Sequence, residues 1–214
     1  METKVKICGL TRAEDVESAI LYGANYLGFI VEAKSSRRLS LSDAARLSLP
    51  AKSSAKTVAV TVNPDDALIK AIAAQMQPDY IQLHGDESVD RVAEIARNSK
   101  TGIIKAIAVA TAEDMKAAEH YAGVANFLLY DAKPPKGESA RGGHGLSFDW
   151  NILSSAPLPK TWALAGGLSP ENAVEAVART NAPILDVSSG LEASAGIKDA
   201  AKIKDFMKAV HNQG

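Results

Sequence analysis

Apolar segments recur along the whole chain, and polar, helix-like stretches lie between them. Most of these segments are near-continuous runs of Val, Ile and Leu without strict alternation, a pattern typical of strands buried on both faces, as in parallel sheets. The eight predicted strands cover residues 5–10, 25–31, 56–62, 80–85, 102–109, 126–132, 161–167 and 183–190.

Helix start signals appear in several of the intervening stretches. Thr11 followed by Glu14 matches a capping box. The pairs 63–64 (Asn-Pro) and 169–170 (Ser-Pro) place a proline in the first helical turn. Together with helical apolar spacing elsewhere, these signals predict helices over 11–23, 63–76, 86–99, 111–123, 169–180 and 197–210.

Eight strand–helix repeats leave little spare chain in 214 residues. A closed (β/α)8 barrel typically has about 250 residues and can be built from about 200. An open doubly wound sheet is the alternative, but it would usually carry a glycine-rich fingerprint after the first strand, where this chain has "CGLT". We therefore expect an α/β fold, a small TIM barrel forming a single domain over residues 1–214. The Pro- and Gly-rich stretch 132–147 is expected to be an active-site loop.

Charge and composition exclude several classes of partner. The 24 basic and 25 acidic residues nearly cancel, so no strong field favours nucleic acid or an anionic membrane. A single Cys excludes an internal disulfide and suits a reducing cytosol. The first residues lack a signal-peptide pattern, and no apolar run approaches the roughly 18 residues of a membrane span. We expect a cytoplasmic protein.

Polar residues interrupt the ends of otherwise apolar strands. In a barrel, the active site lies at the carboxyl ends of the strands, so these residues would cluster there. They are Cys8, His84, Asp131 and Asp186, with Arg37 and Arg38 in the loop after the second strand. Each also has a purely structural interpretation, such as a buried inert thiol or a turn-capping carboxylate. One Cys and four His without paired ligand spacing predict no metal site.

Glycine-bearing turns follow the last two predicted strands. Gly166 and Gly167 end the seventh, and Ser189 and Gly190 end the eighth. Loops after strands seven and eight of such barrels often bind phosphate through backbone N–H groups, and glycine lets the backbone approach the anion closely. A phosphorylated ligand is therefore favoured.

Seven motifs in order, from residue 5 to about residue 192, resemble the phosphoribosylanthranilate isomerase family of tryptophan biosynthesis. They are "KICGLT", "KSSRRLS", "QLHGDE", "LLYDAK", "GLSFDW", "LAGGLSPEN" and "DVSSGLE". The resemblance implies a (β/α)8 barrel that converts N-(5′-phosphoribosyl)anthranilate to 1-(2-carboxyphenylamino)-1-deoxyribulose 5-phosphate. This Amadori rearrangement acts on a small phosphosugar and needs no cofactor. The resemblance also implies a monomer or a homodimer.

The resemblance also assigns residue roles. It implies that Cys8 is the general base and Asp131 the general acid, which suits a reaction that opens a ring and moves a proton. Since only a thiolate is basic, we expect the pKa of Cys8 to be lowered. The family pattern further implies that Arg37 contacts the anthranilate carboxylate, that Asp186 orients the substrate amino group and that His84 lies near the substrate. It also implies that 166–167 and 189–190 hold the phosphate.

Two alternatives stay open. The histidine-pathway phosphoribosyl aminoimidazole isomerase performs the same chemistry on the same fold, but it has an aspartate at the position of Cys8 and a substrate with two phosphates. A non-catalytic barrel that binds a phosphorylated metabolite would keep the glycine turns without a reason to keep both Cys8 and Asp131.

Overall fold

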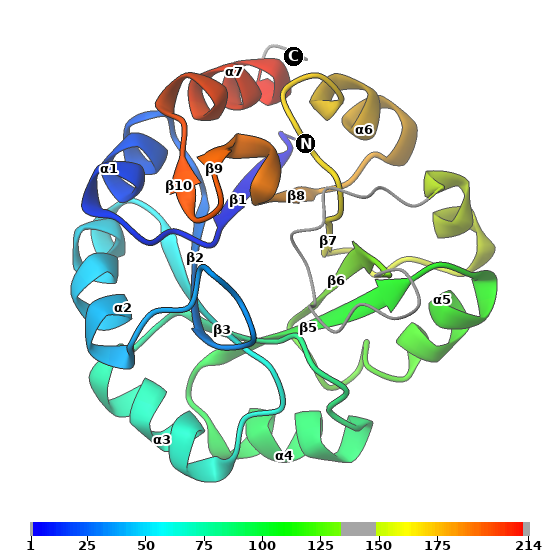
Figure 1. The fold of residues 1–214 in the computed structure, drawn as a ribbon. Coiled ribbons are helices and arrows are strands. Elements are labelled where there is room, and N and C mark those ends of the chain that lie inside the picture. Colours follow the sequence, from blue (N-terminus) through cyan, green and yellow to red (C-terminus); the bar gives the residue numbers. More distant parts are fainter. Residues whose placement is uncertain (1, 134–148, 212–214) are drawn as a thin grey trace.

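The chain folds into a closed barrel of eight parallel strands, seen in a computed structural model that describes residues 2–133 and 149–211 (Figure 1). Strand β8 pairs with β1 and closes the sheet, which confirms the predicted fold. The strands are β1 (Lys4–Cys8), β2 (Tyr26–Glu32), β3 (Lys56–Thr61), β4 (Tyr80–Leu83), β5 (Gly102–Val109), β6 (Phe127–Ala132), β7 (Trp162–Leu164) and β8 (Ile184–Val187). The predicted loop 132–147 lies, from residue 134 on, outside the described residues.

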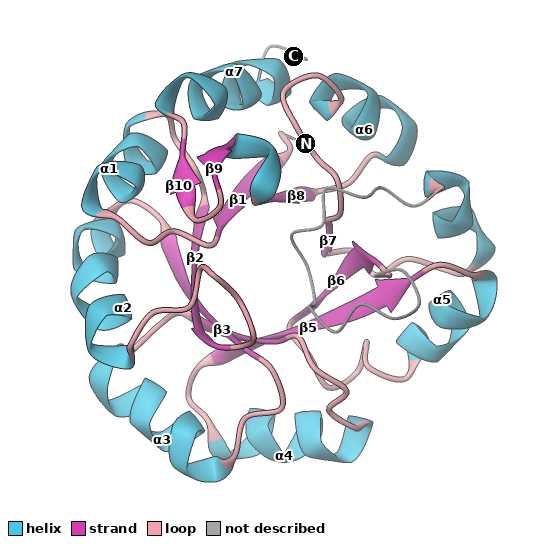
Figure 2. Cartoon of the chain, in the orientation of Figure 1, coloured by secondary structure: helices cyan, strands magenta, loops and turns pink. Residues whose placement is uncertain are grey.

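Helices form an outer ring around the barrel (Figure 2). They are α1 (Ala13–Leu21), α2 (Leu41–Ser48), α3 (Asp66–Gln75), α4 (Val89–Asn98), α5 (Ala112–Glu119), α6 (Ala173–Thr180) and α7 (Ala200–His211), with 3-10 turns η1 (Leu49–Ser53), η2 (Trp150–Ser155) and η3 (Ser189–Leu191). Helix α2 and a short hairpin, β9 (Glu192–Ser194) with β10 (Ile197–Lys198), were not predicted. Within the described chain, no helix is long and apolar enough to cross a membrane.

The starts of the first two predicted helices are wrong in detail. The hydroxyl of Thr11 caps no helix and donates instead to the carbonyl of Gly196 in the β9–β10 turn, so α1 begins only at residue 13. Asn63 has a φ of 49°, which an α-helix does not accommodate. The chain turns there first, and the carboxylate of Asp65 caps α3 by accepting from Leu68 N at 2.7 Å.

Polar side chains close the amino-terminal end of the barrel, which we call the floor. The side chain of the residue just before β2, β4 or β6 accepts a hydrogen bond from a backbone N–H near the start of the preceding strand. The three pairs are Asn25 Oδ1 with Val5 N (2.8 Å), Asp79 Oδ2 with Thr57 N (2.9 Å) and Asn126 Oδ1 with Ile103 N (2.6 Å).

Aromatic rings fill the barrel just inside the floor. Tyr26, Tyr80 and Phe127 pack with ring centroids 5.6–6.1 Å apart, in tilted and edge-on arrangements that aromatic quadrupoles favour. The same inner cluster reaches Cys8 at the other end of β1, while a larger apolar layer lies between the sheet and the helices. The floor is therefore sealed, and polar groups inside the barrel gather at the carboxyl ends of the strands, which we call the mouth.

Candidate active site

Cys8 ends β1 and points into the barrel beside a buried lysine. On neighbouring β2, a Cβ added to Gly28 would lie 3.0 Å from Cys8 Sγ and 3.2 Å from Lys6 Nζ, so the missing side chain leaves room for both groups. Lys6 lies two residues earlier on the same face of the strand, is fully buried and donates to Asp186 Oδ1 at 2.8 Å. The thiol thus lies next to a buried ion pair.

Burial raises the pKa of the Cys8 thiol, and the positive charge of Lys6 only partly opposes this effect. The expectation of a lowered pKa is therefore wrong for the protein alone. For Lys6, burial acts to lower the pKa, but the negative charge of Asp186, together with that of Cys8 when the thiol is ionised, outweighs burial and the pKa is raised. Lys6 therefore remains a cation that favours a thiolate beside it.

Asp131 and His84 meet at the mouth from β6 and from the end of β4. His84 Nε2 lies 3.3 Å from Asp131 Oδ2, while the fully buried Gln82 holds the other ring nitrogen, with its Nε2 2.7 Å from Nδ1. The second oxygen of Asp131 accepts from Ala132 N at 2.9 Å. The carboxyl group is thus held in one orientation, next to a group that can exchange a proton with it.

The two glycine turns lie against each other and against Asp131. Gly166 and Gly167 have φ of 90° and 66°, which glycine adopts without strain. A Cβ on Gly166 would lie 3.2 Å from Asp131 Oδ1, and one on Gly190 would lie 2.0 Å from the carbonyl oxygen of Leu168. Any side chain at Gly190 would therefore force the turns apart.

Four backbone donors in these turns have no hydrogen-bond partner within the described part of the chain. Among residues 2–133 and 149–211, the N–H groups of Gly166, Gly167, Ser189 and Gly190 make no hydrogen bond. Asn172 closes the first turn, since its Nδ2 donates to Gly167 O at 2.8 Å and its Oδ1 accepts from Ser169 N at 2.9 Å. This turn delays the start of α6 to residue 173, so the predicted start at Ser169 is wrong. Such unsatisfied N–H groups beside a helix are typical of an anion site.

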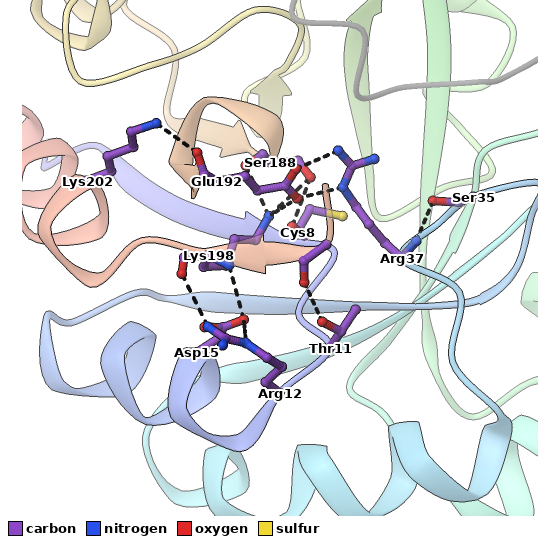
Figure 3. Close-up of polar contacts among 11 residues, drawn as sticks. Cys8, Thr11, Arg12, Asp15, Ser35, Arg37, Ser188, Glu192, Lys198 and Lys202 are labelled. Atoms are coloured by element: carbon purple, nitrogen blue, oxygen red, sulfur yellow. Dashed lines mark hydrogen bonds and ion pairs between the residues drawn. The ribbon is translucent and has the colours of Figure 1, made fainter. Parts of the chain in front are cut away.

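Arg37 reaches the mouth from the loop after β2, but its partner was not foreseen. Its Nε and Nη2 donate to the two carboxylate oxygens of Glu192 at 2.6 and 2.7 Å (Figure 3). Its Nη1 has no partner within the described chain. Arg38 instead points outward, is half exposed and pairs with Glu32 at 2.8 Å.

Sequence reasoning missed four residues of this site. Lys6 and Gln82 each interrupt an apolar strand, and their position two residues before Cys8 and His84 was a usable signal, because residues two apart share a face. Glu192 and Lys198 flank the small-residue turn "ASAG", which is a hairpin signal, but nothing local says which residue they contact. No group of three or more metal-ligating side chains occurs among the described residues.

A closed barrel with acid–base groups and free backbone donors at its mouth defines the class of (β/α)8-barrel enzymes that bind anionic substrates. The family model described as N-(5′-phosphoribosyl)anthranilate (PRA) isomerase matches residues 5–209, and the chain belongs to that family.

Curated relatives and solved structures agree with this assignment. The chain is 45% identical over 193 residues, 90% of either chain, to the N-(5′-phosphoribosyl)anthranilate isomerase of Paracoccus denitrificans (strain Pd 1222). A phosphoribosyl anthranilate isomerase in complex with reduced 1-(o-carboxyphenylamino)-1-deoxyribulose 5-phosphate is 34% identical with a TM-score of 0.85, covering 98% of this chain and 99% of that one. Monomers generated from the dimeric Thermotoga maritima enzyme show 33% identity and a TM-score of 0.83, with the same coverage.

Proposed function

We propose that the chain converts N-(5′-phosphoribosyl)anthranilate to 1-(2-carboxyphenylamino)-1-deoxyribulose 5-phosphate in tryptophan biosynthesis, as the family does. The observation that carries the proposal is the joint presence, at one barrel mouth, of a thiol, a carboxyl–imidazole pair and a set of free backbone donors. The reaction requires a base, an acid and a phosphate-binding site, and these groups can provide all three.

Asp131 is the general acid of this proposal. Protonated Asp131 gives its proton to the ribose ring oxygen as the C1′–O bond breaks, and the anthranilate nitrogen lone pair forms the C1′=N bond. His84 at 3.3 Å supports the resulting carboxylate and can return a proton to it. Ala132 N binds Oδ1 and His84 lies against Oδ2, so the carboxyl group is held in one orientation while it delivers the proton.

Cys8 is the general base. Its thiolate removes the proton from C2′, and the C–H electrons form the C1′=C2′ bond of the enolamine, which then tautomerises to the ketone. A thiol with a raised pKa is scarcely ionised at neutral pH, but it binds a proton more strongly once it is a thiolate. Lys6 provides the adjacent positive charge that makes this ionisation accessible.

The substrate is an anion at both ends, and the mouth offers a site for each. The free N–H groups at 166–167 and 189–190 support phosphate binding there. The Nη1 of Arg37, which has no partner among residues 2–133 and 149–211, supports recognition of the anthranilate carboxylate. Asp186 binds Lys6 through Oδ1, which leaves Oδ2 to orient the substrate amino group.

The assembly and the compartment belong to the same proposal. We propose a cytoplasmic monomer or homodimer that needs no cofactor. The single thiol suits a reducing compartment, and the relative from Thermotoga maritima is described as dimeric.

An assay of the purified chain tests the function. Anthranilate and phosphoribosyl pyrophosphate are supplied with the transferase that makes the unstable substrate, and turnover is followed by the loss of anthranilate-type fluorescence. Turnover of this substrate, with none of the histidine-pathway aminoimidazole substrate, is expected. Turnover of only the latter, or of neither with binding of both, would replace the proposal by one of the two alternatives.

A further inference from the structure

The β9–β10 hairpin brings two buried charges to the mouth. The whole residues Glu192 and Lys198 are only 8% and 3% exposed, and Lys198 Nζ donates to Glu192 Oε1 at 3.0 Å. Burying a carboxylate and an ammonium group is costly even when they are paired, and such pairs are weak evidence of stability. The pair therefore calls for an explanation other than holding the hairpin together.

The contact with Arg37 explains the buried pair, because the Glu192 carboxylate binds a single edge of the Arg37 guanidinium. The contacts at 2.6 and 2.7 Å form a bidentate fork through Nε and Nη2, the geometry that fixes both the position and the plane of an arginine. Burial would raise the pKa of Glu192, but Arg37 and Lys198 together lower it, so the carboxylate is ionised at neutral pH. No residue of the described ranges binds the opposite edge of Arg37, with Nη1, so this edge is open to a ligand.

The hairpin is itself fixed on its outer side (Figure 3). Asp15 and Arg12 of the α1 region hold the backbone of Lys198, with Asp15 Oδ2 3.2 Å from its N–H and Arg12 Nη2 3.3 Å from its carbonyl oxygen. Lys202 donates to the carbonyl oxygen of Glu192 at 2.7 Å. The carboxylate that grips Arg37 is thus held by the framework of the barrel, not by a free loop.

The same cluster reaches the other predicted site elements. Lys198 Nζ donates to Ser188 O at 3.0 Å, and Ser188 Oγ donates to Cys8 O at 3.0 Å. One connected set of bonds therefore ties Arg37 to the turn before Ser189 and to the end of β1. The distance between an anion on Arg37 and one on the glycine turns is set by these bonds.

We propose that Glu192, held by Lys198, is the positioning residue of Arg37 and sets the site for the carboxylate end of the substrate. Glu192 does not touch the substrate and acts only through the guanidinium. The inference rests on the proposed function, in which Arg37 binds the anthranilate carboxylate. Loss of the Glu192 carboxylate leaves the long Arg37 side chain without a fixed position. Substrate affinity therefore falls, while the acid–base groups remain in place.

Glu192→Gln tests the idea, because the amide keeps the shape but has only one acceptor oxygen and no charge. We expect KM to rise about 10-fold, with kcat changed less than about 3-fold. Glu192→Asp keeps the charge on a shorter stem, and an intermediate KM is expected. In an Arg37→Ala background, Glu192→Gln should change KM by less than about 2-fold, since a residue that acts through Arg37 has no effect without it.

Asp79→Asn, at the floor, is the matched control for loss of a hydrogen-bonded carboxylate, and its KM should stay unchanged. An unchanged KM in Glu192→Gln, or an equal rise with and without Arg37, would overturn the positioning role. If Glu192→Gln does not fold, the double-mutant cycle of Glu192→Asp with Arg37→Ala replaces it. The test is again whether the change in KM disappears when Arg37 is absent. An inactive unmodified chain would instead refute the proposed function.

Discussion

The floor and the mouth of the barrel use polar side chains in opposite ways. At the floor, Asn25, Asp79 and Asn126 each satisfy a backbone N–H of a neighbouring strand. At the mouth, charged side chains contact each other in buried groups, as in Lys6 with Asp186 and Arg37 with Glu192. The floor thus completes the hydrogen bonding of the sheet, whereas the mouth carries charges that the sheet does not require.

The energetic difference indicates which end serves function. A floor cap satisfies a buried N–H and is worth about 1 kcal/mol, and an uncapped one would cost about 1–3 kcal/mol. A buried ion pair loses hydration that its attraction often fails to offset, so replacing it by apolar residues is commonly neutral or stabilising. Ion pairs kept at the mouth are therefore better explained by ligand binding and proton transfer than by stability.

Asp131→Asn should give the largest effect. The amide keeps the contact with Ala132 N but cannot deliver a proton, so kcat should fall by about 10²- to 10⁴-fold with a small change in KM. Steady-state kinetics with the enzymatically generated substrate measures both. Asp79→Asn, which makes the same chemical change at the floor, is the control and should turn over normally. Near-normal kcat in Asp131→Asn would remove Asp131 from the mechanism.

Arg37→Lys should give the second-largest effect, a loss of affinity for the carboxylate end of the substrate. A lysine keeps the charge but cannot hold Glu192 by one edge and a carboxylate by the other, so a reduced product analogue should bind about 10- to 100-fold more weakly by calorimetry. Arg38→Lys is the neighbouring control, because Arg38 pairs with Glu32 on the outside. Equal losses in the two variants would contradict the assignment.

The same division explains what the sequence could predict. Strands and glycine turns follow from local patterns, since burial on both faces of a strand and a left-handed φ each restrict the residue types at that position. The positions of Cys8, His84 and Asp131 at the mouth followed from the strand order alone. Their contacts did not, because which side chains meet across a barrel depends on register and rotamer.

Long-range partners were the main omission. Glu192 lies 155 residues after Arg37, and nothing near either residue marks the other as its partner. The expected lowering of the Cys8 pKa also failed, because burial is a property of the folded environment and here outweighs the charge of Lys6. Helix α2 was missed although Ser40, which caps it by accepting from Asp43 N, was a usable start signal; its eight residues, "LSDAARLS", are a short stretch with only two large apolar side chains.

Asp186→Asn should lower the pKa of Cys8, the single cysteine of the sequence. Burial raises the pKa of Cys8, Lys6 lowers it and the negative charge of Asp186 raises it. Removing that negative charge leaves Lys6 without its partner and free to pair with the thiolate, so the pKa of Cys8 should fall. Alkylation by iodoacetamide, followed by mass as a function of pH, should therefore reach half its maximal rate at a lower pH than in the unmodified protein. An unchanged midpoint would mean that Lys6 loses its proton instead, and the Asp79→Asn control should keep the original midpoint.

Asp79→Asn should have the smallest effect, and on stability alone. Burial acts to raise the pKa of Asp79, but its bonds to Lys56 and Thr57 outweigh burial and lower it, so the folded state favours the carboxylate. At neutral pH, the variant should lose about 1–2 kcal/mol of unfolding free energy, a drop in Tm of about 2–8 °C. A carboxylate with a depressed pKa stabilises above its unfolded pKa, and this contribution is lost as the pH falls through the folded value. The difference between the two proteins should therefore be full above about pH 5 and shrink below about pH 4, as calorimetry over this range would show. A difference that is constant with pH would mean that shape and not charge closes the floor, and a changed KM would break the separation between the two ends.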